Sequence, residues 1–466
     1  MLHLKNLLLL NTKMDNKKTL LLIYPANRKR KGFLANRDTK YQPLSLGIIA
    51  ALTPPDWKVK IIDENFREFR YYKADFVGLT AFSSTATRAY EIAAIYRQKG
   101  IPTVIGGIHA SMVPDEAIQH VDCVVVGEAE SIWGTVIRDF EAGKLQKIYK
   151  GDLLEMKNAV KPRRDLFHPG YVFASIQTTR GCPFDCNFCS VSAFNGRHYR
   201  MRPIDEVLDE LQEIPQRNIF FLDDNIVGTS KIHQERAIEL FRKIVERGIK
   251  KDWISQASLN LADNPEVLKW AAKSGCRMIF IGVETELPAA LKESNKRINM
   301  KMGVDSYEKV FAKLHKYGIA SIAGFMFGWD SDTPETIQQR VNYIRHSGAD
   351  SFQTTIVTPL PGTRLFDKLA GEQRLLCNNF PADWQLFDYG DLVYQPKKMS
   401  HPEFSQSFTE ALRQIYEPGH LKWKFIKSWF NLGSFSTAYW CYMSNWNYRN
   451  MHIQDGRKVK NWFLEK

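Results

Sequence analysis

Three cysteines gathered in one short segment most constrain what this chain can be. Cys182, Cys186 and Cys189 have the spacing C-x3-C-x2-C, and the apolar run Tyr171–Ile176 before them predicts a strand. A loop that leaves a strand end can turn three such thiolates toward one centre. Among protein metal centres, soft thiolates select zinc or iron–sulfur clusters. The segment therefore predicts a metal centre at the end of a strand.

The number of ligands helps to separate the two kinds of centre. A structural zinc site is normally closed by four protein ligands, and a fourth Cys or His at suitable spacing is hard to find, because His198 lies beyond a further turn. Three ligands suit a 4Fe–4S cluster with one iron left open for a small molecule. The alternatives are a zinc knuckle or three unrelated thiols.

Residues 19–150 alternate short apolar runs with amphipathic segments. The predicted strands are 20–24, 59–62, 76–79, 103–105 and 123–126, and the clearest helices between them are 86–98 and 131–140. The runs are continuously apolar, as is typical of parallel strands covered on both faces. This pattern predicts an open doubly wound sheet, in which ligands lie beyond the carboxyl ends of the strands.

Two glycine-containing loops follow strands of this first domain. Gly106, Gly107 and His109 come directly after one strand, and Gly127 and Glu128 come after the next. Glycines at such positions let the backbone approach a bulky ligand closely. The alternative is a Rossmann-like domain whose glycines serve only tight turns.

Residues 171–375 repeat the βα pattern. The predicted strands are 173–178, 218–223, 252–258, 278–283, 319–326 and 350–357, with helices at 203–211, 234–246, 265–274, 306–317 and 334–346. This count predicts a partial (β/α)6 barrel, with its chemistry at the carboxyl ends of the strands.

Polar residues collect at these predicted strand ends. Asp223, Asp224 and Asn225 lie at or just after the end of the predicted strand 218–223, Ser258 and Asn260 lie at or just after the end of 252–258, and Glu284 follows 278–283. A buried strand tip should not carry charge unless a partner compensates it. Any one residue is as well explained by a turn or a helix cap, but their register on successive strands favours one shared site.

The cysteine spacing, with Phe188 just before the last cysteine, resembles the signature of radical S-adenosylmethionine (SAM) enzymes. The resemblance implies that the open iron binds SAM and that the cluster delivers the electron that cleaves it to a 5′-deoxyadenosyl radical. It also implies that Phe188 and Glu284 belong to the SAM site. By the same resemblance, Asp223, Asp224 and Asn225 receive the amino group of SAM, and Ser258 and Asn260 contact its carboxylate or ribose.

The first domain resembles the cobalamin-binding domain that precedes many radical SAM domains. This implies cobalamin contacts from Gly106, Gly107, His109, Gly127 and Glu128. The Asp-x-His-x-x-Gly motif that supplies a cobalt ligand in other cobalamin proteins is absent, so His109 need not ligate cobalt. The order of motifs over residues 19–375 is closest to the group that contains the hopanoid methylases.

The expected organisation is an N-terminal tail (1–18), a Rossmann-like cobalamin-binding domain (19–150), a linker (151–170), a radical SAM barrel (171–375) and a mostly helical, aromatic C-terminal region (376–466). Within this last region, residues 383–389 are expected to line the barrel mouth. Residues 421–430 interleave lysines with aromatics, a theme that continues to Trp462 and Phe463. This composition is typical of interfacial membrane helices; a helical cap that packs its aromatics on the barrel is the alternative.

The composition places the chain in a reducing compartment. Seven cysteines, three of them clustered, fit a cytoplasmic protein better than a disulfide framework, with peripheral membrane contact as a further expectation. No apolar run reaches the roughly 18–20 residues that span a bilayer. The net charge of +13 is dispersed and no RNA- or DNA-binding module is visible, so no nucleic acid partner is expected.

Together these features predict a cobalamin-dependent radical SAM methyltransferase with a 4Fe–4S cluster. We expect it to act on an unactivated carbon of a small hydrophobic, lipid-like substrate and to take electrons from an external donor. The alternative is a radical enzyme without bound cobalamin that cyclises, couples or rearranges its substrate. A remote alternative is an RNA-modifying protein, suggested by the positive charge.

Overall fold

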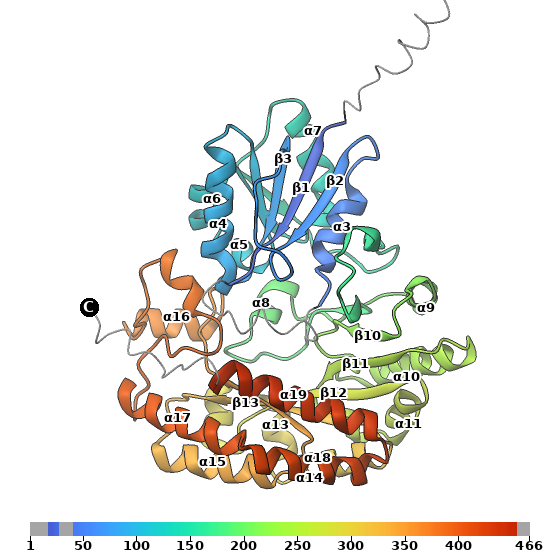
Figure 1. Ribbon diagram of the computed structural model, residues 1–466, viewed down its shortest axis with the longest axis vertical. Helices are drawn as coiled ribbons and strands as arrows, with labels where there is room; N and C mark the ends of the chain where they lie inside the picture. Colours follow the sequence, from blue (N-terminus) through green and yellow to red (C-terminus); the bar gives the residue numbers. More distant parts are fainter. Residues whose placement is uncertain (1–16, 28–40, 454–466) are drawn as a thin grey trace, which may run out of the picture.

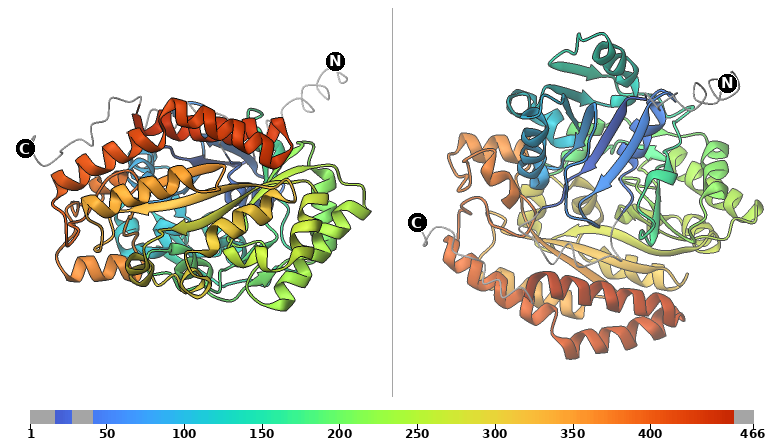
Figure 2. Two further views of the ribbon diagram at one scale, coloured as in Figure 1. Left: turned by 90° about the horizontal axis from the view of Figure 1, so that it is seen from below. Right: turned by 45° about the horizontal axis from the view of Figure 1, so that its top comes forward.

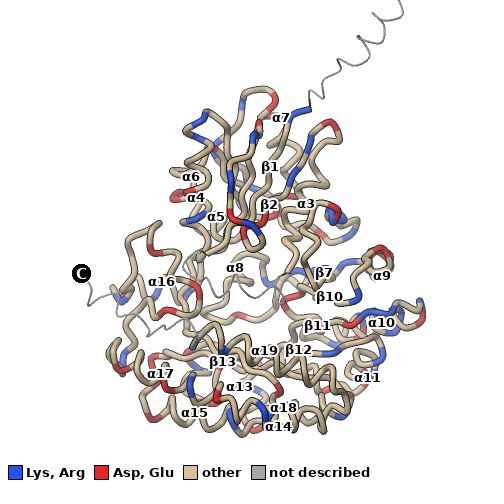
Figure 3. The backbone as a smooth tube through the Cα atoms, viewed as in Figure 1, with Lys and Arg blue, Asp and Glu red and all other residues tan. Residues whose placement is uncertain are grey.

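The computed structural model describes residues 17–27 and 41–453, which form two α/β lobes stacked end to end (Figure 1). Most of the expected tail 1–18 and the aromatic pair Trp462 and Phe463 lie outside the described residues. Lysine and arginine are spread over both lobes and are interspersed with acidic residues (Figure 3).

The N-terminal lobe is a parallel six-stranded sheet with the order β2-β1-β3-β4-β5-β6. Its strands are β1 (Thr19–Tyr24), β2 (Lys58–Asp63), β3 (Phe76–Thr80), β4 (Thr103–Gly106), β5 (Cys123–Gly127) and β6 (Ile148–Gly151). The first five follow the 2-1-3-4-5 order of doubly wound nucleotide-binding folds. This confirms the predicted Rossmann-like sheet.

Helices cover both faces of this sheet because neighbouring strand residues point to opposite sides. They are α3 (Leu44–Leu52), α4 (Ser83–Arg97), α5 (Ile108–Met112), α6 (Pro114–His120) and α7 (Trp133–Glu141), with the 3₁₀ helix η2 (Ala129–Ser131) before α7. Leu20 and Leu22 pack with residues of α3 and α7. Leu21 and Ile23 pack with α4 on the other face.

Strand β6 was not predicted, because it is only four residues long and ends in Lys150 and Gly151, two residue types that are depleted in strands. It pairs with β5 over four residues, from Val124 with Ile148 to Gly127 with Gly151. The side chain of Tyr149, the second residue of β6, is buried. The sheet therefore extends one residue past the expected domain boundary at 150.

The C-terminal lobe contains a second parallel six-stranded sheet, with the order β14-β13-β12-β11-β10-β7. The strands are β7 (Phe173–Ile176), β10 (Asn218–Phe221), β11 (Asp252–Ala257), β12 (Cys276–Glu284), β13 (Ala320–Phe327) and β14 (Ser351–Ile356). All six predicted strands are present, and the predicted partial barrel is confirmed.

One face of the barrel sheet is covered by the helices that connect its strands. These are α9 (Ile204–Glu213), α10 (Lys231–Glu246), α11 (Pro265–Lys273), α12 (Pro288–Ser294), α13 (Arg297–Met302), α14 (Ser306–His315) and α15 (Pro334–His346), with η4 (Leu259–Asp263) before α11. Thr333 starts α15 as an N-cap whose hydroxyl accepts from the Thr336 N–H, and Pro334 follows it at the first helical position.

The opposite face of the barrel sheet is covered by the C-terminal helices. After α16 (Arg364–Gly371) and η5 (Ala382–Leu386), the chain forms α17 (His401–Ile415), α18 (Pro418–Leu432) and α19 (Phe435–Ile453). Met278 and Ala320 of the sheet pack with Ala438 and Cys441 of α19. Figure 2 (left) shows α18 and α19 lying across the sheet on the side away from α10 and α14.

The C-terminal region also satisfies the edge strand β14. The Asn445 side chain accepts from the Phe352 N–H at 2.9 Å and donates to the Asp350 carbonyl at 3.0 Å. Tyr416 donates its hydroxyl to the Phe352 carbonyl at 3.0 Å. An edge strand whose backbone groups are paired in this way cannot recruit another strand.

The linker packs tightly on both lobes. Its 3₁₀ helix η3 (Arg164–Leu166) carries Arg164, which donates to Gln42 of the N-terminal lobe at 2.8 Å and to the Ser175 carbonyl of β7 at 2.7 Å. Tyr171 donates a hydrogen bond to Asp63 at the end of β2. These contacts join the lobes through buried polar groups.

Residues 376–389 depart from the expectation that 383–389 line the barrel mouth. Trp384 and Phe387 are buried in the core. Trp384 donates its indole N–H to Glu116 of α6, and Thr87 of α4 donates to the Pro381 carbonyl at 2.7 Å. This segment packs on the N-terminal lobe because its aromatic rings are buried there and its polar groups find hydrogen-bond partners on α4 and α6. Among its aromatic residues, Tyr389 remains 40% exposed.

Candidate active site between the two lobes

The cysteine loop lies between the two sheets, where α8 (Ser190–Asn195) follows the third cysteine (Figure 1). Its base is closed by a short antiparallel ladder in which β8 (Thr179–Arg180) pairs with β9 (Arg200–Met201). Gly181 has φ +89°, and a side chain there would meet the His198 carbonyl. Only glycine fits this turn, which holds Cys182 at the top of the ladder.

The three cysteine thiols lie near enough to influence one another. Burial raises the pKa of Cys182 to about 11 and that of Cys189 to about 12, and the neighbouring thiols add to both shifts. Such thiols ionise only when a cation balances them, as a bound metal does. This donor set fits an iron–sulfur cluster.

Within residues 17–27 and 41–453, no group of three His, Cys, Asp or Glu side chains is placed to hold a single metal ion. A 4Fe–4S cluster gives each cysteine its own iron, so three thiolates from one loop suit such a cluster.

A buried ion pair lies beside the thiols. Lys296 Nζ donates to Glu284 Oε1 at 2.5 Å, and Glu284 has the left-handed φ of +65°. Burial opposes the charge on Lys296, but Glu284 and the thiols of Cys186 and Cys189 outweigh it and raise the pKa of Lys296. Sequence reasoning selected Glu284 and missed Lys296, which no motif marks.

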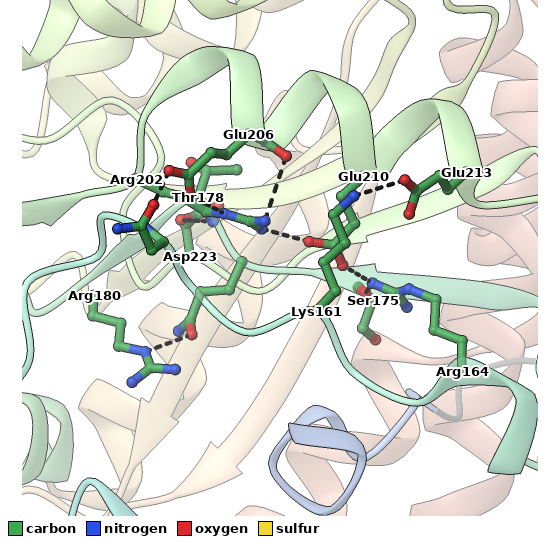
Figure 4. Close-up of polar contacts among 12 residues, drawn as sticks. Lys161, Arg164, Ser175, Thr178, Arg180, Arg202, Glu206, Glu210, Glu213 and Asp223 are labelled. Atoms are coloured by element: carbon green, nitrogen blue, oxygen red, sulfur yellow. Dashed lines mark hydrogen bonds and ion pairs between the residues drawn. The ribbon is translucent and has the colours of Figure 1, made fainter. Parts of the chain in front are cut away.

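Asp223 anchors the strand before the cysteine loop. Its Oδ1 accepts from the Thr178 N–H at 2.9 Å and from the Thr179 hydroxyl at 2.7 Å, and it also accepts from the Thr179 N–H. The side chain is fully buried. Figure 4 shows Asp223 beside Thr178, near the buried Arg202–Glu210–Arg164 contacts. Asp223 thus supports the loop from below through Oδ1, and its buried Oδ2 has no hydrogen-bond partner among the described residues.

Asp224 differs from its neighbour in its surroundings. It accepts from the Asn195 amide at 3.2 Å. Burial, opposed by this hydrogen bond and reinforced by Asp223, raises its pKa to about 6. A cationic ligand group near this carboxylate, such as the ammonium of SAM, would stabilise its ionised form, because few protein groups donate hydrogen bonds to it.

Asn225, Ser258 and Asn260 form one hydrogen-bonded group at the ends of β10 and β11. Asn225 Nδ2 donates to Ser258 Oγ at 2.9 Å, and Ser258 Oγ donates to Asn260 Oδ1. Asn260 Nδ2 donates to the Gly228 carbonyl at 3.0 Å. The structure therefore brings these three predicted residues together, at the end of β10, which pairs with β7, and at the end of β11, the next strand along.

A cavity of about 240 Å³ lies beneath the cysteine loop, lined by residues that include Asn187, Glu293, Trp329 and Tyr394. Phe188 contacts Trp329 edge-on, with ring centroids 5.8 Å apart. The Trp329 indole N–H is buried and has no hydrogen-bond partner among the described residues. A buried unpaired donor is costly, so a ligand acceptor there would be favoured.

The glycine loops of the N-terminal lobe lie at the carboxyl ends of β4 and β5. Gly107 has φ +91°, and a Cβ there would lie 2.6 Å from Thr80 Oγ1, so its own protein neighbours require glycine. At Gly106 a Cβ would meet only Val125 atoms at ordinary contact distances, and φ is not in the left-handed region. Its small size leaves room for a large ligand at this strand end, as cobalamin requires.

His109 faces the interior of its lobe. Nδ1 lies 3.2 Å from Ser83 Oγ, and Nε2 lies 3.2 Å from the Tyr90 hydroxyl and 3.5 Å from Glu116 Oε1. The side chain is buried on the α4–α6 side and packs edge-on against Trp384. Both ring nitrogens are therefore engaged by the protein, and the expected cofactor contact from this side chain is not supported.

Glu128 likewise faces protein partners rather than a ligand. Its carboxylate accepts from Arg200 at 2.5 Å and from the Leu154 N–H at 2.9 Å, and it lies 3.2 Å from Arg180. Arg180 also reaches Glu130 at 2.6 Å. Sequence reasoning selected Glu128 for its position after β5, but it could not show that two arginines of the cysteine-loop ladder lie opposite.

Two further residues lie near the site. Tyr389, the last residue of the segment expected to line the barrel mouth, has φ +67°, and its carbonyl accepts from the Ile356 N–H at the end of β14. Arg340, which was not predicted, is fully buried and pairs with Asp332 at 3.0 Å and Glu286 at 3.1 Å, at the carboxyl ends of β12 and β13. A helical arginine has no local sequence signal that marks such a role.

Two family models match this chain. Residues 176–344 match the radical SAM superfamily, and residues 30–136 match the B12 binding domain. The first match spans the cysteine loop and most of the barrel, and the second spans most of the N-terminal lobe.

Related proteins and structures agree with these matches. Bacteriochlorophyllide d C-12(1)-methyltransferase of Chlorobaculum tepidum is 29% identical over 88% of this chain and 89% of its own length. Hopanoid C-2 methylase of Rhodopseudomonas palustris is 29% identical over 72% of this chain and 65% of its own length. The methyltransferase TsrM of Kitasatospora setae, solved with cobalamin and a 4Fe–4S cluster, superposes with a TM-score of 0.66.

The TsrM superposition covers 95% of this chain and 100% of that chain at 16% identity, which shows a shared fold. The two family matches account for both lobes, and the curated relatives are methylating enzymes of the same build. The chain is therefore a B12-binding radical SAM enzyme, related to the bacteriochlorophyllide and hopanoid methylases.

Proposed function

We propose that this enzyme methylates an unactivated carbon of a hydrophobic small molecule, with a 4Fe–4S cluster, SAM and cobalamin as its cofactors. The observation that carries the proposal is the position of the cysteine loop. The helix α8, which follows Cys189, contacts α5 of the B12-binding lobe. Gly362 of the barrel packs on Met112 at the end of α5.

The division of labour follows from this arrangement. When bound, the cluster supplies the electron that cleaves SAM, and cobalamin supplies the methyl group. We assign Cys182, Cys186 and Cys189 to the cluster. We assign Asp224 to the ammonium of SAM, and the Asn225–Ser258–Asn260 group to its polar end. Gly106 and Gly107 form the close backbone approach to cobalamin.

The protein's own contribution is to keep the meeting point of the lobes dry and rigid. The Phe188 and Trp329 rings line one side of the cysteine loop. The largely buried ion pair of Lys296 and Glu284 lies beside the thiols. A carbon radical reacts with whatever lies nearest, so excluding water protects the intended reaction. An external electron donor is required because each cleavage of SAM consumes one electron.

The substrate class rests on the relatives and on the aromatic surroundings of the site. The relatives named above act, by their names, on a bacteriochlorophyllide and a hopanoid, both largely apolar ring systems. Tyr389 is half-exposed at the end of β14, where an apolar ring could stack on it. We therefore propose a polycyclic or lipid-like acceptor.

The test begins with protein purified without oxygen after expression with cobalamin. We expect about four irons per chain and near-stoichiometric cobalamin in the absorption spectrum. SAM carrying a labelled methyl group should then label hopanoid or tetrapyrrole acceptors and yield 5′-deoxyadenosine. Cys189→Ala should abolish both products. Cleavage of SAM without bound cobalamin or methyl transfer would instead favour a non-methylating radical enzyme.

A further inference from the structure

The hairpin of α18 and α19 has one face that is held firmly by the barrel. Leu421, Lys424, Ser428 and Leu432 of α18 are buried, at the spacing of one helix face. Lys424 Nζ donates to the Ala349 carbonyl at 2.9 Å, and Ser428 donates to Asp350 Oδ1 at 2.7 Å. These bonds fix the rotation of α18 about its axis.

The other face of the hairpin carries large apolar side chains in solvent. We call it the aromatic face, and it consists of Trp423, Ile426, Trp429, Phe430, Phe435 and Tyr439. Phe430 is 79% exposed and Phe435 is 55% exposed. A contiguous group of this kind on a soluble surface marks an interaction site.

Four of the aromatic rings are in contact with one another across the two helices. The ring centroids of Trp429 and Phe435 lie 5.4 Å apart, those of Phe435 and Tyr439 lie 6.3 Å apart, and those of Trp429 and Phe430 lie 5.9 Å apart. These four rings therefore form one preformed patch, and Trp423 and Ile426 are exposed on the same helix as Trp429. The fixed rotation of α18 presents this patch without any rearrangement of the barrel.

The charged side chains of the hairpin itself all have the same sign. Residues 418–453 include Lys422, Lys424, Lys427 and Arg449 and contain no Asp or Glu. Lys422 is exposed, and the Lys427 ammonium lies 5.1 Å from the centre of the Trp423 ring. Long lysine side chains beside aromatics can reach phosphates while their stems stay on apolar surface.

We propose that the aromatic face rests on an anionic membrane surface. Tryptophan, phenylalanine and tyrosine would enter the headgroup level, with Lys422 and Lys427 against lipid phosphates. Within the described part of the chain, no helix is long and apolar enough to cross a bilayer, so the contact is peripheral. A second copy of the chain fits less well, because a two-fold contact brings the lysines of one copy toward those of the other.

The test is flotation of the full, cofactor-loaded chain with vesicles of phosphatidylcholine and phosphatidylglycerol in equal parts. We expect the protein to float with these vesicles, less with phosphatidylcholine alone, and less at high salt. The double variant Trp429→Ser, Phe430→Ser should stay unbound. Lys422→Gln and Lys427→Gln should each weaken binding to the anionic vesicles roughly fivefold.

Ile232 on α10 provides the matched control, since it is 67% exposed and far from the hairpin in sequence. Ile232→Ser should float like the wild type, and all variants should keep the wild-type thermal unfolding midpoint. The proposal is overturned if the aromatic variant still floats or if the wild type does not. It is also overturned if light scattering shows a dimer in solution that the aromatic variant abolishes.

The membrane proposal does not rest on the proposed function. The aromatic variant should cleave SAM at the wild-type rate in the absence of vesicles, because the hairpin contributes no residue to the cysteine loop. A wild-type chain that floats but transfers no methyl group would count against the proposed function alone. A wild-type chain that methylates a dispersed acceptor but does not float would count against the membrane surface alone.

Discussion

Arg200 holds Glu128 across the boundary between the two lobes. Nη2 lies 2.5 Å from Oε1 and Nη1 lies 3.0 Å from Oε2, and both side chains are nearly fully buried. Burial opposes the charge on Glu128, but Arg200 and Arg180 outweigh it and hold the pKa of Glu128 below its usual value. The pair joins the end of β5 to the ladder beneath the cysteine loop.

We predict that breaking this pair uncouples the two halves of the reaction. Glu128→Gln should cost about 3–5 kcal/mol of stability, because it leaves the buried Arg200 guanidinium without its carboxylate. Arg200→Gln should cost less, because Arg180 remains 3.2 Å from Glu128. The double variant should cost less than the sum of the two. Methyl transfer should fall more than 5′-deoxyadenosine formation, since the cysteine loop loses its fixed position relative to the B12-binding lobe.

The control for this prediction is the Arg202–Glu210 pair of the barrel, in which both side chains are equally buried. Arg202→Gln should destabilise the protein but leave the ratio of the two products unchanged, because the contact of Glu210 with Arg164 of the linker remains. Equal ratios for the Glu128 and Arg202 variants would show that the bridge between the lobes does not set the geometry of the reaction.

The neighbouring carboxylates Asp223 and Asp224 should behave differently when substituted. Asp223→Ala removes the acceptor of two backbone N–H groups and one hydroxyl, so it should lower both the thermal midpoint and the iron content. Asp224→Ala should leave iron content near wild type and weaken SAM binding at least tenfold, as expected for a lost charge-assisted contact. Iron analysis and equilibrium dialysis with SAM distinguish the effects of the two substitutions. Equal iron loss in both variants would contradict the different roles assigned to Asp223 and Asp224.

His109 should not ligate cobalt. Its two ring nitrogens are held by Ser83 and Tyr90, and the side chain is buried. His109→Asn should therefore leave the paramagnetic resonance spectrum of bound Co(II) cobalamin unchanged. The thermal midpoint should fall, because buried hydroxyls lose their partner. A spectrum with nitrogen splitting that disappears in this variant would place His109 on the metal.

Lys424 should make stability depend on pH. Burial lowers its pKa to about 7 from the ordinary value of 10.5. Between these values the unfolded chain binds more protons than the folded chain, so the contribution of Lys424 makes stability rise as pH rises from about 7 toward 10. The cost of burying the charge is fully present below about pH 7.

The variant Lys424→Met should flatten this dependence. Thermal midpoints at several pH values between neutral and mildly alkaline should rise less steeply than in the wild type. Lys316→Met, at an exposed position on the neighbouring α14 turn, should leave the slope unchanged. Parallel slopes for the wild type and the Lys424 variant would show that the ammonium is not desolvated.

The local patterns of the chain were sufficient to predict every strand of the two sheets except β6. Continuous apolar runs such as Leu20–Tyr24 and Phe76–Leu79 mark buried parallel strands, because burial on both faces leaves no polar alternation. The cysteine spacing predicts its centre because all three ligands come from one loop. Both features depend on residues that are close in sequence.

The residues whose contacts could not be predicted from the sequence have partners in distant segments of the chain. Glu128 and Arg200 are 72 positions apart, and Trp384 and Glu116 are 268 apart. A carboxylate after a strand looks the same in sequence whether it meets a ligand or an arginine from another lobe. His109 was selected for its place after glycines, yet the side to which its ring turns is decided by Tyr90 and Trp384.

The two edges of the barrel sheet, β7 and β14, are connected through α19. Trp440 contacts Phe173 of β7 with centroids 5.5 Å apart, and Asn445 binds the backbone of β14. Strands in a ladder keep a spacing of about 4.8 Å, whereas packed side chains can be exchanged for larger or smaller ones. Substitutions in this one helix can therefore change how strongly the sheet curves while its ladder and the cysteine loop stay untouched.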